Sequence, residues 1–160
     1  MIKDDATDAA VSYGHRVENE VFPPYPVRDV RARYVWQVGC PSDFADVTVD
    51  FEPWEDGIVL EVAHGAELVG TIPEGELRSW HESFVEGIRE ELAARGAGGV
   101  ALAVLIHRTV IHDVDSSARS FRAAGRVAVR EAFVRIDGPG PALAAPSRPH
   151  RRQSSIPVKT

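Results

Sequence analysis

The sequence predicts an α/β fold of the α+β type: a two-layer sandwich in which two helices cover one face of a four-stranded, mainly antiparallel sheet. Two observations carry this prediction. Three segments with strand character precede the first helical segment, and a fourth strand separates the two helices. Each helix also has one apolar side, so both can bury that side against the same face of the sheet. With 160 residues, the chain fits one domain with tails.

We expect three parts along the chain: an extended N-terminal lead-in over residues 1–30, a folded domain over residues 31–136 and a Pro/Arg-rich tail over residues 137–160. Three prolines between residues 22 and 26 prevent a regular helix in the lead-in. The tail is rich in Pro, Ala, Ser and Arg, a composition that is typical of disordered segments. The fold and the site are therefore expected in the central part.

The first three strands are predicted by β-branched and alternating residues. Residues 31–37 form the first strand, and turn-forming residues over 39–43 predict a loop after it. Over residues 47–51 apolar side chains alternate with polar ones, which is the period of a half-buried strand. A turn at 54–57 leads to a third strand over 58–62. We expect these strands to be antiparallel neighbours.

A helix of about twenty residues is predicted after Pro73, with its apolar side formed by Leu77, Trp80, Phe84, Ile88 and Leu92. Another side of this helix is acidic and carries Glu82, Glu86 and Glu90. An apolar, β-branched run over residues 100–111 predicts a central strand. The second helix runs from about residue 117 to 136, and small residues on its apolar side predict close packing on the sheet: Phe121, Ala124, Gly125, Ala128 and Ala132.

The charge of the chain is unevenly distributed. The net charge of the whole chain is −6. Residues 116–160 hold nine Lys/Arg and two Asp/Glu, which gives a net charge of +7. Residues 1–115 hold nine Lys/Arg and 22 Asp/Glu, which gives a net charge of −13. A basic C-terminal third and an acidic remainder suggest that one face of the protein binds phosphate and that another faces water or binds a basic protein. A solvated surface that is uneven without a partner explains the same counts, so both interpretations stay open.

Composition also indicates the cellular compartment of the protein. The chain has no apolar run approaching the ~18 residues that a membrane span needs. Its N-terminus is polar and acidic, unlike a signal peptide. A single cysteine cannot form an internal disulfide. These observations predict a cytoplasmic protein that does not enter a membrane.

The most informative run is residues 112–124, His-Asp-Val-Asp-Ser-Ser-Ala-Arg-Ser-Phe-Arg-Ala-Ala. It resembles the hallmark of domain IV of translation elongation factor G, in which a His-(Asp/Glu)-Val-Asp-Ser-Ser loop opens a helix of the form Phe-x-x-Ala-(Ala/Gly). Shorter matches occur in the family order: Gln37-Val38-Gly39 for Gln-Ser-Gly, Ile72-Pro73 for Ile-Pro, and residues 87–92 for Gly-Ile-x-Glu-x-Leu. The resemblance covers roughly residues 31–136.

This resemblance implies a ribosomal protein S5 domain 2-like fold with a left-handed crossover, although general rules predict the opposite hand. In elongation factor G, the domain is the arm that reaches the decoding site of the ribosome. The resemblance implies ribosome or RNA contact for the matching residues of two tip loops: Gln37, Gly39, His112, Asp113, Asp115, Ser116 and Ser117. The sequence contains no Gly-x-x-x-x-Gly-Lys-(Ser/Thr) motif, so we expect no bound nucleotide, no cofactor and no GTPase activity from this chain, a stand-alone arm without the motor.

The first tip loop departs from the family pattern. The family has Gly-Gly-Arg-Gly-Gln-Tyr-Gly-His, whereas residues 39–46 read Gly-Cys-Pro-Ser-Asp-Phe-Ala-Asp. The lost glycines hinder close approach of the backbone to RNA, and the two new acids repel phosphate. The segment before His112 is also shorter than in the family, and Ala118 stands where the family usually has Glu. These departures favour a loss of RNA contact at the first loop.

Four arginines at helical spacing follow the second tip loop, and we call them the arginine stripe: Arg119, Arg122, Arg126 and Arg130. Because guanidinium forks suit phosphate, the stripe and the tip loop can engage one RNA backbone. The alternative is a solvated face whose arginines pair with Glu131 or with the acidic helix. Just before the stripe, Asp115 or Ser116 is expected to cap the second helix.

No catalytic residue and no metal site are predicted. A His, Asp and Ser in consecutive loop positions point in different directions and cannot converge as a triad, and the histidines and the cysteine lack ligand spacing. We therefore expect a non-catalytic protein associated with the ribosome, through its small subunit, or with other RNA. The alternative is a protein-interaction module that kept the fold, lost RNA binding and binds an unknown protein partner.

Overall fold

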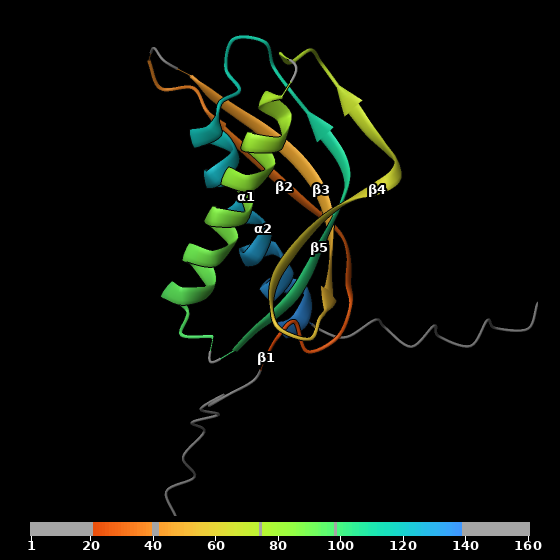
Figure 1. The fold of residues 1–160 in the computed structure, drawn as a ribbon. Coiled ribbons are helices and arrows are strands. Elements are labelled where there is room, and N and C mark those ends of the chain that lie inside the picture. Colours follow the sequence, from red (N-terminus) through yellow and green to blue (C-terminus); the bar gives the residue numbers. More distant parts are fainter. Residues whose placement is uncertain (1–20, 40–41, 74, 98, 139–160) are drawn as a thin grey trace, which may run out of the picture.

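The computed structural model describes residues 21–39, 42–73, 75–97 and 99–138, and it confirms the predicted fold class (Figure 1). A sheet forms one layer, and two helices lie side by side as the second layer. The expectations for residues 1–20 and 139–160 lie outside the described residues. In chain order the elements are β1 (Val21–Phe22), β2 (Val27–Trp36), β3 (Asp43–Pro53), β4 (Gly57–Val69), α1 (Glu76–Ala94), β5 (Gly99–Val110) and α2 (Ala118–Asp137).

The four long strands form the main sheet in the order β2-β3-β5-β4. The β2–β3 and β3–β5 pairs are antiparallel, as predicted, whereas β4 and β5 are parallel. Parallel neighbours need a crossover connection, and α1 supplies it because it lies between β4 and β5 in the chain. The two-residue β1 has no counterpart in the prediction; it pairs in parallel with the start of β5, at Gly99.

Two strands begin earlier than predicted. β2 begins at Val27 rather than at residue 31. β3 begins at Asp43, inside the predicted loop, although its first residues include two acids. These acids fit a strand because each carboxylate pairs with an arginine: Asp43 with Arg119 and Asp46 with Arg31. The start of a strand that depends on such distant ion pairs cannot be predicted from the local sequence pattern.

β4 contains an irregularity that interrupts its alternation. Its pairing with β5 shifts register between Val62 and Glu67, and Gly65 between them has a φ of 79°. A bulge of this kind bends a strand without ending it, so β4 runs to Val69 and the predicted end at residue 62 is wrong. Among the described residues β4 pairs only with β5, which leaves its outer edge open.

The core lies between the helices and the sheet face that they cover. Alternate residues of β2, β3 and β5 point into it, and both helices contribute their predicted apolar sides. Burying each large side chain stabilises the fold by about 1.5–3 kcal/mol. On the opposite face of the sheet, Arg31 pairs with Asp46 and Arg28 with Asp50. The largest fully buried side chains are Phe51, Phe84, Phe121, Ile88, Leu92, Leu102 and Ile106.

α1 and α2 meet through their backbones at two glycines. A Cβ on Gly87 would lie 1.9 Å from the carbonyl oxygen of Arg122, and one on Gly125 would lie 2.0 Å from that of Phe84. Atoms at these distances overlap, so glycine alone permits this approach. The small residues of α2 therefore serve its contact with α1 as well as its contact with the sheet, whereas the sequence predicted close packing on the sheet alone.

His81 connects α1 to β5 inside the molecule. Its Nε2 lies 2.9 Å from Oγ1 of Thr109, and both side chains are buried. Burial lowers the pKa of His81 from 6.5 to about 4. The imidazole is therefore neutral in the folded protein at neutral pH, and its protonation opposes folding.

The Gly125→Ala and Gly87→Ala variants are expected to destabilise the fold, because each new methyl group meets backbone that cannot move aside. We expect the free energy of unfolding to fall by about 1–3 kcal/mol, even after the gain of about 1 kcal/mol that alanine brings to a helix. Urea denaturation measures this change. Gly99→Ala is the control, since a Cβ there has ordinary contact at 3.5 Å with a side-chain carbon of Val21. Equal stability of all three variants would contradict the backbone contact.

Mild acid is expected to destabilise the protein through His81. Between pH 6.5 and about 4, the unfolded chain binds a proton on His81 that the folded protein does not, so stability is full above pH 6.5 and falls as the pH drops towards 4. The expected loss is on the order of 2–3 kcal/mol. The His81→Gln variant cannot titrate at this position. Urea denaturation across this range should show wild type losing stability relative to the variant, and a difference independent of pH would refute the assignment.

Candidate nucleic-acid interface

Two loops meet at the end of the sheet where β3 begins. They are the loop between β2 and β3 and the loop between β5 and α2, which we call the tip loops (Figure 1). The amide of Phe44 donates to the carbonyl of Asp115 over 2.8 Å, and Ser116 Oγ donates to the carbonyl of Phe44 over 2.9 Å. The second tip loop is thus bonded directly to the first residues of β3.

Further hydrogen bonds fix the second tip loop around His112. The amide of His112 donates to Ser116 Oγ over 2.9 Å, and its Nδ1 lies 3.0 Å from a carboxylate oxygen of Asp115. The other carboxylate oxygen of Asp115 accepts from Ser42 Oγ of the first loop over 2.5 Å. The His112 side chain is nevertheless 58% exposed. Asp115 therefore orients an imidazole that faces solvent. The centroids of the His112 and Phe44 rings lie 6.1 Å apart.

Ser117 caps α2, so the expectation that Asp115 or Ser116 does so is wrong. Ser117 Oγ accepts from the amide of Ser120, and Ser120 Oγ accepts from the amide of Ser117 in return. This reciprocal pair leaves the two preceding side chains free to join the tip loops. The remaining predicted tip residues, Gln37, Gly39 and Asp113, lie exposed at the same end. Val114 beside them is 85% exposed, an apolar tip residue that the sequence reasoning did not single out.

Each member of the arginine stripe pairs with a carboxylate. Arg119 Nη2 lies 2.7 Å from Asp43, and Arg130 Nη2 lies 3.0 Å from Glu91. Arg122 and Arg126 both pair with Glu90 of α1. Of the two partners left open by the sequence, the acidic helix supplies three of these contacts, and Asp43 of β3 supplies the fourth. The stripe therefore links α2 to α1 and to β3 as well as facing solvent.

Glu90 pairs with two arginines of the stripe at once. Hydrogen bonds from Arg122 and then Arg126 lower the pKa of Glu90 from 4.5 to about 2, so the carboxylate stays ionised at neutral pH. Two guanidinium groups face one carboxylate, which leaves one positive charge at this point of the stripe. That charge is the available attraction for an anion, and the exposed surroundings keep it modest.

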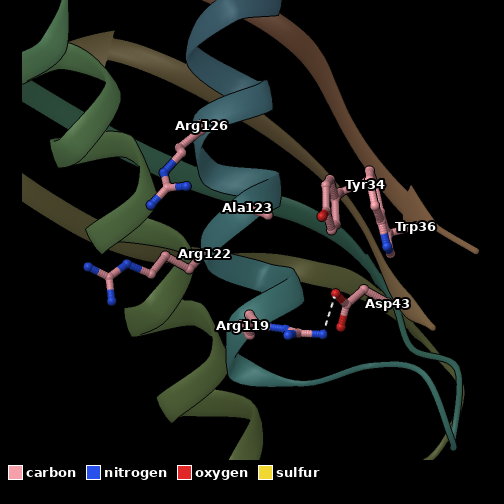
Figure 2. Close-up of a pocket in the computed structure, with 7 residues that line it drawn as sticks. All are labelled: Tyr34, Trp36, Asp43, Arg119, Arg122, Ala123 and Arg126. Carbon is pink, nitrogen blue, oxygen red and sulfur yellow. Dashed lines mark hydrogen bonds and ion pairs between the residues drawn. The ribbon is translucent and has the colours of Figure 1, made fainter. Parts of the chain in front are cut away.

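A groove of 330 Å³ lies across α2 beside the stripe. Figure 2 shows Tyr34 and Trp36 on one side of α2, Arg122 and Arg126 on the other, and Ala123 between them. Arg119 and Asp43 close the end towards the tip loops. Trp36 is 51% exposed, and the sequence did not mark it as a site residue. Its alternation with Tyr34 along β2 was the available signal, because residues two apart share a strand face.

A second groove, of 620 Å³, lies between α1 and β4 and is lined largely by apolar side chains that include Leu60, Val62 and Leu77. In the described part of the chain, no three His, Cys, Asp or Glu side chains gather in a way that would hold a metal ion. No helix within the described ranges is both long and apolar enough to span a membrane.

Comparison with known proteins gives one family. The family model described as "Elongation factor G, domain IV" matches residues 24–135 of this chain. Among solved structures, the crystal structure of a protein from Thermus thermophilus is similar to it, with a TM-score of 0.49 and 23% identity. That similarity covers 64% of this chain and 15% of the other, so this chain spans a small part of that protein's length.

The Ser116→Ala variant is expected to loosen the tip loops, because its hydroxyl both accepts from His112 and donates to Phe44. We expect the free energy of unfolding to fall by about 1–2 kcal/mol, with faster hydrogen exchange at the amides of His112 and Phe44. Ser83→Ala is a matched control, since its hydroxyl donates to the carbonyl of Ser79 within α1, away from the tip loops. Unchanged exchange at both tip amides would show that Ser116 does not hold the loops together.

Proposed function

The chain belongs to the elongation factor G domain IV family, and from this premise we propose that it is a non-catalytic protein that associates with the ribosome, through the small subunit, or with other RNA. It has no GTPase activity of its own. The observation that carries the proposal is His112, which Asp115 orients on an exposed loop where the family has its tip histidine. Such a side chain acts by contact, and its exposure suits docking into a larger partner.

The hydrogen bonds of the tip support a non-catalytic role. An imidazole beside a carboxylate resembles the base of a hydrolase, but such a site also needs a free nucleophile within reach. The three serine hydroxyls at the tip are engaged elsewhere: Ser42 with Asp115, Ser116 with the carbonyl of Phe44, and Ser117 with the amide of Ser120. This arrangement favours a rigid docking surface over a reaction centre.

The charges near the tip support a modest affinity for RNA. Exposed guanidinium groups of Arg119 and Arg122 lie on the helix that begins at the tip, and forked N–H donors suit phosphate oxygens. Their carboxylate partners reduce the net attraction. We therefore expect few phosphate contacts. The logarithm of the binding constant should fall linearly with the logarithm of the salt concentration, with a slope of about −0.7 for each phosphate contact with a single strand.

The second candidate function is a protein-interaction module in which RNA contact is lost. The pairing of every stripe arginine with a carboxylate favours it, and so does the apolar groove between α1 and β4, where Val62 is 58% exposed. Salt dependence separates the two candidates. Binding to RNA weakens as the salt concentration rises, whereas binding through a protein interface with an apolar core does not.

Co-sedimentation with ribosomes and with separated subunits, at low and moderate salt, tests the proposal. We expect saturable association with the small subunit, weaker at moderate salt, and a loss of about tenfold in affinity for His112→Ala, equivalent to about 1.4 kcal/mol. His64→Ala is the control, because His64 is an exposed histidine of β4 rather than of a tip loop. Absence of association with ribosomes and with RNA at low salt would refute the proposed function and turn the search to protein partners.

A further inference from the structure

The groove across α2 is lined by aromatic and hydrogen-bonding side chains on one side of the helix and by arginines on the other (Figure 2). We propose that it binds one unpaired nucleotide of a single-stranded RNA, with the base against Trp36 and the phosphate at Arg122 and Arg126. The proposal rests on the proposed function for its choice of RNA as partner. It differs from the contact through the tip loops in its aromatic residues and in its test, while Arg122 is common to both. The volume of 330 Å³ lies at the lower end for small-ligand sites.

The aromatic side of the groove offers a stacking surface. Tyr34 and Trp36 lie two residues apart on β2 and face the groove side by side (Figure 2). Trp36 is half exposed, so the core does not require its indole, whereas an unpaired base can cover it. Every base has a π-face, so stacking on an aromatic ring binds single strands with little preference for sequence. A base inside a duplex is already stacked and cannot reach this ring.

The cationic side supplies the phosphate contact. Arg122 and Arg126 share Glu90, and the hydrogen bond of Arg122 to Glu90 uses one terminal nitrogen. A guanidinium has five N–H donors, so further donors remain for a phosphate oxygen without loss of the contact with α1. The surplus positive charge of the pair attracts that phosphate. The arginines and the rings lie on opposite sides of Ala123, which separates a phosphate site from a base site.

Asp43 gives the groove a direction. Its carboxylate pairs with Arg119 at the end nearer the tip loops, so this end is close to neutral and carries a hydrogen-bond acceptor. A phosphate therefore finds no net positive charge at this end, whereas the N–H groups of a base edge can donate to the Asp43 carboxylate through the 9% of its side chain that is exposed. The phosphate is therefore directed to Arg122 and Arg126, and the base to Trp36 and Asp43. An acidic peptide would engage the arginines but would leave the rings uncovered.

The test is fluorescence anisotropy of labelled single-stranded oligonucleotides, with the full chain and without ribosomes. Trp36→Leu removes the stacking surface, and Ala123→Leu fills the floor of the groove without changing its charge. We expect each to weaken binding by about 5- to 150-fold, the equivalent of about 1–3 kcal/mol for one stacked base. Glu90→Gln removes the competing carboxylate and is expected to tighten binding and steepen its salt dependence. Trp54→Leu is the matched control, since Trp54 is 49% exposed beyond the far end of β3.

Circular dichroism and urea denaturation establish that each variant is folded. Binding that is equal for single-stranded and duplex RNA, or unchanged by both Trp36→Leu and Ala123→Leu, would overturn the groove assignment while leaving ribosome association through the tip intact. Full competition by a free nucleoside monophosphate, at the same concentration as the oligonucleotide, would assign the groove to mononucleotides and overturn the RNA partner. Loss of RNA binding in Trp36→Leu with retained co-sedimentation supports two separate contacts.

Discussion

The backbone contact between α1 and α2 at Gly87 and Gly125 is the constraint on which the surface of this protein depends. Because the two helices touch without intervening side chains, residues that flank the contact lie within ion-pairing distance of one another. Glu90 follows Gly87 by three positions and reaches both Arg122 and Arg126. A wider spacing would separate these charges and leave one wall of the α2 groove without its fixed arginines.

The tip loops and the groove share the first residues of β3. Phe44 is bonded to the second tip loop through both its amide and its carbonyl, while the adjacent Asp43 holds Arg119 at the end of the groove. Because Asp43 and Phe44 are adjacent in β3, the end of the groove lies next to the tip loops, and the two proposed RNA contacts are compatible with a single bound strand.

The local patterns of the sequence predicted the layers well and the surface poorly. Alternation and helical spacing are set by burial on one side of an element, which is why the sandwich, the two helices and core residues such as Phe84 and Phe121 were predictable. The N-cap moved from Asp115 or Ser116 to Ser117 because three adjacent residues are all good caps, and only the bonds of the first two to neighbouring loops decide among them. The groove depends on the register that sets Trp36 opposite Asp43 and on the crossing of two helices, neither of which has a local signal.

The open edge of β4 bears on how the protein behaves at high concentration. A long, regular edge strand offers a template on which a neighbouring chain can extend the sheet, the first step of ordered aggregation. Here the register shift around Gly65 breaks the row of donors and acceptors, and the exposed carboxylates of Glu61 and Glu67 flank the break. Because the carboxylate of Glu67 pairs with Arg108, the register shift rather than charge repulsion is the main obstacle to edge-to-edge pairing. The distortion of β4 therefore hinders the addition of a further strand at this edge, and a regular strand through residue 65 would remove that obstacle while leaving the core untouched.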